Sequence, residues 1–354
     1  MKMYQLGERV KFSLFGKSHS SYIGGILEGI PAGMTVNENL ISEDMQLRKP
    51  SAGIGTPRSE DDKVEFVQGL YNGKTDGNPI LFLIPNQNTD GSKYLKFIET
   101  PRPGHADLPA LVKFNEHDIR GGGQFSGRLT AAIVAGGSIV KQFNSKFGIT
   151  TSAFTRSIGS VKDTEERNIA DAKISKKYPT RACDQTLNDA MTEEILNASK
   201  DMDSVGGVIE CITTGLPIGF GGIWFEALDA EIAKAVFGIP ACKGIEFGKG
   251  FELARMRGSQ SNDPFYYNDG VKMKTNNMGG ILGGMSDGAP MVFRTIFKPT
   301  PSIGKEQDTV NLTKSENAKL IIQGRHDPCI VPRAAIVVEA VTAMVIADQI
   351  QRGL

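Results

Sequence analysis

The chain has 354 residues, and its 40 Lys and Arg are balanced by 40 Asp and Glu, so its formal net charge is zero. Hydrophobic residues make up 40% and charged residues 23% of the chain, which is typical of a globular protein and excludes wholesale disorder and collagen-like structure. Zero net charge argues against a protein that coats nucleic acid, which would carry a basic excess, but it is compatible with a local basic pocket.

The first predicted elements are a hairpin and a helix. Residues 64–70 and 80–84 are rich in β-forming side chains and flank the turn-forming stretch 72–79, which predicts a β-hairpin. Residues 129–147 are rich in Ala, Ile and Val and are followed by Gly148, a helix stop signal, so they are predicted to form a helix.

Further along the chain, a strand is predicted over 205–213, a loop over 215–222 and a second strand over Met291–Phe297. The longest predicted helix covers 333–351, where apolar residues recur at helical spacing. Strands with helices between them indicate layers of sheet and helix. Because no linker or repeat divides the sequence, we expect one continuous α+β domain over residues 1–354.

Several absences narrow the class of protein. The N-terminal stretch lacks the apolar run of a secretory signal, and the most apolar segment, 334–347, contains Glu339 and is too short to span a membrane. The four cysteines include no CxxC pair, so no metal site is expected. These features predict a soluble, cytoplasmic protein with reduced thiols.

The glycine content invites a nucleotide-loop interpretation, because 41 glycines exceed the number of about 25 that an average composition would give. No GxGxxG fingerprint is present, however, since Gly121 and Gly123 are followed by Ser126 where a third glycine is required. Residues 244–250 are one residue short of a P-loop and lack its Ser or Thr. The pattern argues against both nucleotide-binding folds.

Histidines are few, and three of the four lie in Gly- and Pro-rich segments, at His19, His105 and His326. Taken singly, each is compatible with an ordinary surface histidine. Binding residues nevertheless concentrate on positioned loops, and histidine is the side chain best suited to move a proton at neutral pH.

Anion-binding features lie in the same kind of loop. Residues 120–128 combine three glycines with the start of a predicted helix, which suits an anion, or else they form a connector with Ser126 as N-cap. Lys298, Thr300 and Ser302 follow a predicted strand and suit a phosphate, or else they form an ordinary turn. Asp327 is either an acid–base group or a turn residue.

Arginine and lysine recur throughout these loops, and arginine is suited to a bidentate grip on carboxylate and phosphate; solvated surface charge is the alternative. From the residues alone, the sequence indicates an enzyme for a small, multiply anionic ligand, without defining the reaction. The cations in question are Arg48, Lys49, Arg58, Arg102, Arg120, Arg128, Lys298, Arg325 and Arg333.

A series of eight motifs, in order along residues 5–350, resembles the chorismate synthase family. They are FGKSHSSYIGGILEGIPAG at 15–33, the Arg-rich segment at 47–58, the hairpin at 71–87, RPGHAD at 102–107, RGGGQFSGR at 120–128, GILGG at 280–284, KPTPSI at 298–303 and GRHDPC at 324–329.

The resemblance implies a layered β-α-β sandwich and a homotetramer. It also implies the activity of a carbon–oxygen lyase of the shikimate pathway, which leads to the aromatic amino acids. The reaction is the anti-1,4-elimination of phosphate from 5-enolpyruvylshikimate 3-phosphate to give chorismate. It requires reduced FMN without net redox change, with NADPH as a candidate reductant.

Site residues are carried over by the same resemblance. His19, His105, Asp327 and Ser126 are expected to be catalytic, and the expected substrate contacts are Arg48, Arg58, Arg128 and Arg325. The expected FMN contacts are Gln124, Phe125, Ser126, Pro240, Ala241, Gly283, Lys298, Pro299, Thr300, Pro301, Ser302 and Arg325.

The sequence departs from the family pattern at several positions. Lys17 and Ser20 replace a Glu and a Gly of the first motif, Ile54 replaces an arginine, and Gln124-Phe125 replace Arg-Ser. Because the expected catalytic residues remain, we expect a divergent branch that retains activity. The alternatives are a non-catalytic protein that binds flavin or an anion, and another phosphate-handling lyase or transferase.

Overall fold

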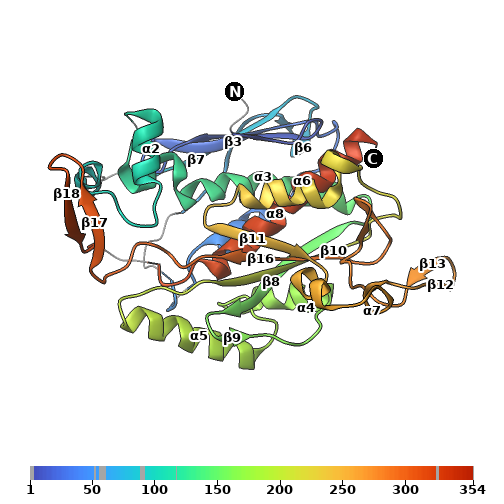
Figure 1. Ribbon diagram of the computed structural model, residues 1–354. Helices are drawn as coiled ribbons and strands as arrows, with labels where there is room; N and C mark the ends of the chain where they lie inside the picture. Colours follow the sequence, from blue (N-terminus) through green and yellow to red (C-terminus); the bar gives the residue numbers. More distant parts are fainter. Residues whose placement is uncertain are drawn as a thin grey trace.

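Two five-stranded antiparallel sheets enclose a layer of helices (Figure 1). The computed structural model describes residues 4–51, 53–55, 61–87, 92–116, 118–323 and 327–353. The arrangement confirms the expected α+β fold with a layered β-α-β sandwich.

The first sheet has the strand order β1-β2-β3-β7-β4. β4 pairs with β7, with Phe66 opposite Phe82, so the predicted hairpin is confirmed. Its tip carries the short pair β5 (Leu70–Tyr71) and β6 (Lys74–Thr75). The strands of the sheet are Gln5–Leu6, Lys11–Gly16, Tyr22–Glu28, Ile80–Pro85 and Glu65–Gln68 in this order.

The second sheet has the order β11-β16-β10-β8-β9. The strands predicted over 205–213 and Met291–Phe297 are its neighbours β10 and β16, in which Cys211 lies opposite Phe293. Both residues are fully buried, which is why these strands are strongly apolar. The strands of the sheet are Cys242–Phe247, Met291–Phe297, Gly207–Thr214, Thr150–Ile158 and Val161–Lys162 in this order.

Four helices make up the layer between the sheets: α1 (Glu38–Arg48), α3 (Thr130–Ser145), α6 (Leu228–Phe237) and α8 (Val331–Arg352). The helices predicted over 129–147 and 333–351 are α3 and α8. α8 is apolar on all sides because it is buried along almost its whole length. At Gly137 of α3, a Cβ would lie only 2.3 Å from the Cβ of Ala340, so glycine is required for the close packing of α3 on α8.

One charged residue, Glu339, lies in the middle of α8 with its side chain 1% exposed. Its Oε2 lies 3.0 Å from the Nζ atoms of both Lys141 and Lys176, and its Oε1 accepts the backbone N–H of Ala153 at 2.9 Å. Burial acts to raise the pKa of Glu339, but the two lysines and these hydrogen bonds lower it to about 2. The carboxylate therefore joins α3 and the second sheet to α8.

The C-terminal part of α8 also holds the first sheet. Oδ1 of Asp348 accepts the backbone N–H groups of Glu8, Arg9 and Val10 at 2.9, 2.6 and 2.9 Å. α8 therefore contacts both sheets through buried carboxylates. No helix within the described ranges combines the length and apolarity that a membrane crossing needs.

Further elements lie at the edges of the sandwich (Figure 1). α4 (Ile169–Ile174) and α5 (Gln185–Lys200) cover the outer face of the second sheet. The hairpin β17–β18 (Gln307–Asn311 and Glu316–Leu320) lies at one end of the molecule. The arm β12–β13 (Phe265–Tyr267 and Val271–Met273) projects at the other end.

Candidate functional site

His19 lies in the loop that connects β2 to β3 and is 6% exposed. Its ring makes an edge contact with Tyr94, with 5.8 Å between centroids. The glycine triplet of η2 (Arg120–Phe125) packs on the same loop, since Ser18 N–H donates to Gly123 O at 3.1 Å. At Gly121, φ is +58° and a Cβ would lie 2.2 Å from Cε1 of His19, so glycine alone permits this contact.

Two of the expected substrate arginines meet at one carboxylate. Arg48 ends α1, and Arg128 lies in the short helix η3 (Gly127–Leu129) just before α3. Oδ2 of Asp62 lies 3.0 Å from Nη2 of Arg48, and Oδ1 of Asp62 pairs with Nη1 of Arg128. The three side chains are between 1% and 6% exposed, so the cluster is buried.

Asn86 connects this cluster to the loop of His19. Its Oδ1 accepts a hydrogen bond from Nε of Arg128 at 2.8 Å. Its Nδ2 donates to the backbone carbonyls of Lys17 and Ser20 at 3.2 and 2.7 Å. Of the two residues that depart from the family motif, Lys17 is held by Asn86 through its backbone oxygen, whereas Ser20 adds side-chain hydrogen bonds: its Oγ accepts the Lys17 N–H at 2.9 Å and donates to the backbone oxygen of Tyr22 at 2.6 Å.

Asp327 joins the cluster from the other side. Its Oδ2 lies 2.5 Å from Nη1 of Arg333, in the first turn of α8, and Nε of Arg333 donates to the backbone oxygen of Arg48 at 3.0 Å. Burial raises the pKa of Asp327 above its ordinary value, more than Arg333 lowers it. Asp327 therefore keeps a proton to a higher pH than an exposed aspartate does.

A second group forms around His105. Its Nε2 lies 2.9 Å from Oγ of Ser302. Nζ of Lys298 donates to the backbone oxygen of Gly104 at 2.6 Å, and the backbone N–H of Lys298 donates to the backbone oxygen of Ala241 at 3.0 Å. Burial and the charge of Lys243 lower the pKa of Lys298. The expected FMN segment after β16 and the segment at Ala241 therefore lie side by side.

Tyr94 links the two groups. The guanidinium of Arg102 lies 5.6 Å from the ring centroid of Tyr94 and 4.6 Å from that of Phe97. The same guanidinium forms a buried ion pair with Asp107 at 2.7 Å. The ring of Tyr94 also contacts His19, and the backbone N–H of His105 donates to the backbone oxygen of Arg102 at 3.4 Å, so Arg102 and Tyr94 lie between the two histidine-containing loops.

Three further expected residues, 124–126, lie just before Arg128. Ser126 is the N-cap of η3, and its Oγ accepts Arg128 N–H at 3.3 Å. Phe125 is 41% exposed and lies beside Phe114. Gln124 precedes it in η2. The substrate residues Arg58 and Arg325, together with His326, lie outside the described residues.

Gly283 lies apart from the His105 group. It follows β14 (Ile281–Leu282), near the start of β16, whereas Lys298 follows the end of that strand. A strand of this length spans roughly 20 Å. These two of the segments that the resemblance assigns to FMN therefore lie at opposite ends of β16 within one chain.

Sequence reasoning missed Asp62, Asn86 and Tyr94. Asp62 stands in an acidic run at 60–62, a pattern that usually indicates a solvated surface. The surplus of arginines in the loops was the available signal, because buried arginines require a buried carboxylate partner. Nothing in the local sequence of Asn86 or Tyr94 distinguishes them.

A cavity of about 420 Å³ adjoins this cluster, between η1 (Ser92–Ile98), α2 (Asp107–Phe114) and η2. Its lining is apolar with an acidic part, and among the described residues it includes no lysine or arginine. Such a lining disfavours a phosphate or a carboxylate. The arginine cluster is therefore the better anion site. The lining residues are Phe97, Ile98, Asp107, Leu111, Asn115, Glu116, Asp118 and Ile119.

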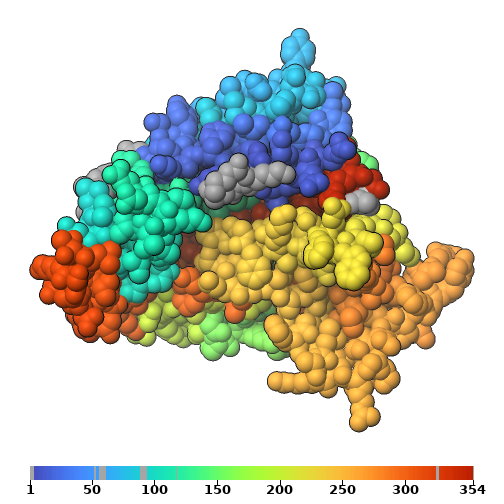
Figure 2. All heavy atoms as spheres, turned by 45° about the horizontal axis from the view of Figure 1, so that its top comes forward, coloured from blue at the N-terminus to red at the C-terminus, as the bar shows by residue number. Residues whose placement is uncertain are grey.

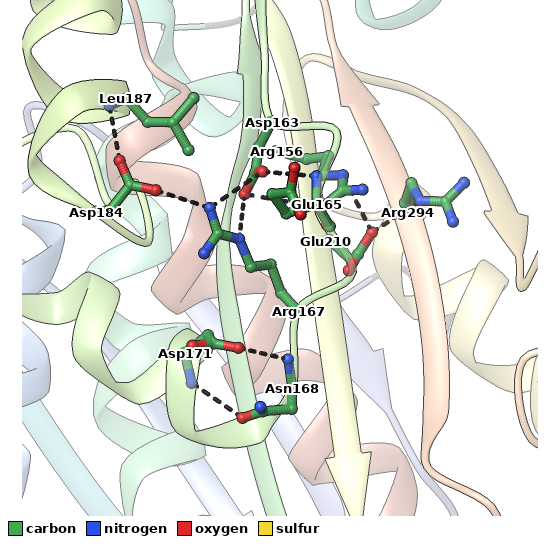
Figure 3. A network of polar contacts seen from close by, with 10 residues as sticks. All are labelled: Arg156, Asp163, Glu165, Arg167, Asn168, Asp171, Asp184, Leu187, Glu210 and Arg294. Carbon is green, nitrogen blue, oxygen red and sulfur yellow. Dashed lines mark hydrogen bonds and ion pairs between the residues drawn. The ribbon is translucent and has the colours of Figure 1, made fainter.

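Another concentration of charge lies under α4 and α5, on the outer face of the second sheet (Figure 3). Arg167 bridges Asp163 and Asp184 at 2.8 and 2.7 Å, and Oδ1 of Asp184 caps α5 by accepting Leu187 N–H at 2.9 Å. The hydrogen bonds that Arg167 donates to Asp163 and Asp184 raise the pKa of Arg167. This network fastens α5 to the sheet and has a structural role.

Comparison with known proteins agrees with this geometry. A family model described as "Chorismate synthase" matches residues 10–351. The chain is 44% identical over 348 residues to chorismate synthase of Thermococcus kodakarensis, covering 98% of this chain and 97% of that one. It is 41% identical over 367 residues to chorismate synthase of Methanocaldococcus jannaschii, covering 99% and 97%.

A solved structure is also similar. The structure titled "Crystal Structure of Chorismate Synthase" superposes with a TM-score of 0.80 at 29% identity, covering 98% of this chain and 93% of that chain. The similarity therefore extends over the whole sandwich and both groups of candidate site residues.

Proposed function

The chain belongs to the chorismate synthase family, and from this premise we propose how its own residues act on the substrate. The activity is that of a phosphate lyase of the shikimate pathway. The substrate we propose is 5-enolpyruvylshikimate 3-phosphate, which carries two carboxylates and a phosphate. The continuous cluster that joins Arg48 and Arg128 to His19 is the observation that carries the proposal.

The arginines bind and orient the anionic substrate. Guanidinium groups match the geometry of carboxylate and phosphate, and Arg48 and Arg128 are fixed from different helices by one carboxylate. Holding the substrate in one geometry lowers the entropic part of the barrier. Arg58 and Arg325 are proposed as further substrate contacts on the family resemblance.

The proton-carrying residues are His19, His105 and Asp327. We assign to His19 the proton that goes to the departing phosphate, since Gly121 and Tyr94 fix its ring. His105 is the second proton-transfer group, with Nε2 oriented by Ser302. Asp327 is the third proton-transfer candidate, because it lies beside the arginine cluster through Arg333 and burial raises its pKa above the ordinary value.

The residues after β16 fit the phosphate of FMN. Lys298 supplies a cation, and Oγ1 of Thr300 is buried without a hydrogen-bond partner within the described ranges. With Ala241 alongside, this segment would hold the cofactor near His105, and Ser126 with Gln124 and Phe125 would hold it near the arginines. When bound, reduced FMN would supply electron density to the C–O bond that breaks, without being consumed.

A homotetramer remains our proposal for the assembled enzyme. Four strongly exposed aromatic residues lie in the segment 224–267, which extends in Figure 2 from the centre, in yellow, to the lower right, in orange. Exposed apolar surface of this kind marks sites of association. The four residues are Trp224, Phe225, Phe251 and Tyr267, at 82%, 90%, 85% and 83% exposure. Sedimentation velocity measures the mass of the assembly directly.

A cytoplasmic location of the protein also stays a prediction.

An anaerobic assay tests the proposal. Reduced FMN and the enolpyruvyl substrate are mixed with the protein, and chorismate absorbance and phosphate release are followed together. Equal amounts of both products are expected. If neither appears while flavin still binds, the protein is a flavin-binding relative without turnover. Oxidation of NADPH with free FMN in air would identify a chain that reduces its own flavin.

A further inference from the structure

Asp62 is a buried carboxylate at the centre of the candidate site, outside the set of residues that the family resemblance assigns. We propose that Asp62 is a positioning residue, which sets the spacing and orientation of the two arginines for the anionic substrate. The proposal rests on the roles given above to Arg48 and Arg128.

The geometry gives each oxygen of Asp62 its own arginine. Oδ2 lies 3.0 Å from Nη2 of Arg48, while Oδ1 pairs with Nη1 of Arg128. The guanidinium groups are held from behind as well: Nη1 of Arg48 donates to Oγ1 of Thr130 at 3.4 Å, and Nε of Arg128 donates to Asn86 at 2.8 Å. Moving Asp62 would therefore move both arginines.

The charges explain why a carboxylate is needed at this position. Two guanidinium groups on one carboxylate repel each other, and burial strengthens that repulsion. With a side chain only 1% exposed, Asp62 offsets the repulsion without help from water.

The backbone at Asp62 supports a specific function for this side chain. Its φ is +53°, in the left-handed region that a residue other than glycine rarely adopts. Such a conformation persists when surrounding contacts hold it, and it is typical of functional sites. The preceding residue, Asp61, is exposed and has the same charge, which makes it a matched control.

Three variants test the inference: Asp62→Asn, Asp62→Glu and, as control, Asp61→Asn. Asp62→Asn keeps the size of the side chain but removes its charge, so the arginines lose their common support. We expect kcat to fall by about 100-fold, the effect of an approximately 1 Å misplacement. Inorganic phosphate, used as a competitive inhibitor, should bind several-fold more tightly, because the positive charge of Arg48 and Arg128 is no longer offset.

These two changes have opposite signs, which separates positioning from a merely structural effect. General damage to the fold would lower kcat and weaken phosphate inhibition together, and that result would overturn the proposal. Asp62→Glu retains the charge but is longer by one methylene group. It should restore phosphate inhibition to the wild-type level while kcat stays low.

If Asp62→Asn does not fold, the longer variant decides alone: a kcat within twofold of wild type in Asp62→Glu would overturn the proposal. Asp61→Asn should match wild type in both measurements. Failure of the arginine roles is distinguishable, since Arg48→Ala and Arg128→Ala would then leave the KM for substrate unchanged whatever Asp62→Asn does.

Discussion

Replacing Glu339 with glutamine removes a negative charge from the centre of the helix layer and tests how far buried ion pairs hold this sandwich together. The carboxylate of Glu339 forms ion pairs with Lys141 and Lys176 at 3.0 Å each. In the variant, Lys141 keeps its pair with Asp44 at 2.7 Å, and Lys176, whose side chain is 30% exposed, can reach water. The lost ion pair therefore matters mainly for Lys141, whose side chain is less exposed, at 19%, and keeps only one of its two carboxylate partners.

Two routes give a similar magnitude. The pKa of Glu339 is lowered from 4.5 to about 2, and at about 1.4 kcal/mol per pKa unit the ionised form gains roughly 3–4 kcal/mol of stability. Removing one partner of a buried ion pair costs about 3–5 kcal/mol. We expect Glu339→Gln to lower the free energy of unfolding at pH 7 by about 3 kcal/mol.

At acid pH the difference in unfolding free energy between wild type and Glu339→Gln should disappear. Because the pKa of Glu339 is lower in the folded chain than in the unfolded chain, its contribution is fully present above about pH 5 and is lost as the pH falls toward 2. Urea unfolding at several pH values measures the difference between wild type and variant. Glu316→Gln, which removes an exposed partner of Lys314 at 3.7 Å, is the control and should match wild type.

The reasoning would be refuted by a loss below about 1 kcal/mol at pH 7. It would equally be refuted by a difference between wild type and Glu339→Gln that does not shrink between pH 5 and pH 2. The small loss would mean that the lysines find other partners or water in the folded variant, so that the buried carboxylate contributes specificity rather than stability. The difference that persists in acid would mean that the loss does not come from the ionised carboxylate.

Three further predictions concern the candidate site. His105→Ala should lower kcat by about 10²–10⁴-fold if His105 transfers a proton; steady-state kinetics with a kcat near wild type would contradict that role. Asp327→Asn should alter the pH dependence of kcat, because the variant lacks a carboxyl group with a raised pKa. Flavin fluorescence should report unchanged FMN binding. An equal loss of kcat and of FMN binding would mean that Asp327 has a structural role. Gly121→Ala should displace the ring of His19 and lower kcat strongly, whereas Gly122→Ala carries similar backbone strain at φ +84° but has Ser126 as its nearest neighbour, at 3.8 Å, and should lower kcat much less. Equal effects of the two glycine variants on kcat would show that strain, and not contact with His19, is responsible.

The elements with strong local signals were predictable from the sequence. α3, α8 and β16 are apolar and have clear ends, and the structure confirms them within a few residues. α5 escaped prediction because it is largely polar, with few buried residues, and is fastened by ion pairs such as that of Arg167 with Asp184. Local propensity contains no information about such contacts.

Within the site, the limit of prediction was long-range pairing. His105 and Ser302 are 197 residues apart and lie 2.9 Å from each other, whereas Gly283 and Lys298 are close in sequence and lie at opposite ends of a strand. Asp62 was overlooked because the acidic run around it looks like a surface. Only the fold decides which of those carboxylates faces inward.

The position of α8 has a consequence for biosynthesis. This helix is synthesised after all the strands that it contacts, yet it fills the space between the sheets and holds both of them, through Glu339 and Asp348. Until the ribosome has released it, each sheet exposes the part of its inner apolar face that α8 covers, and Arg333 cannot yet reach Asp327. A chain stalled before α8 would therefore be a substrate for chaperones, and the catalytic cluster would be completed only after α8 has emerged from the ribosome.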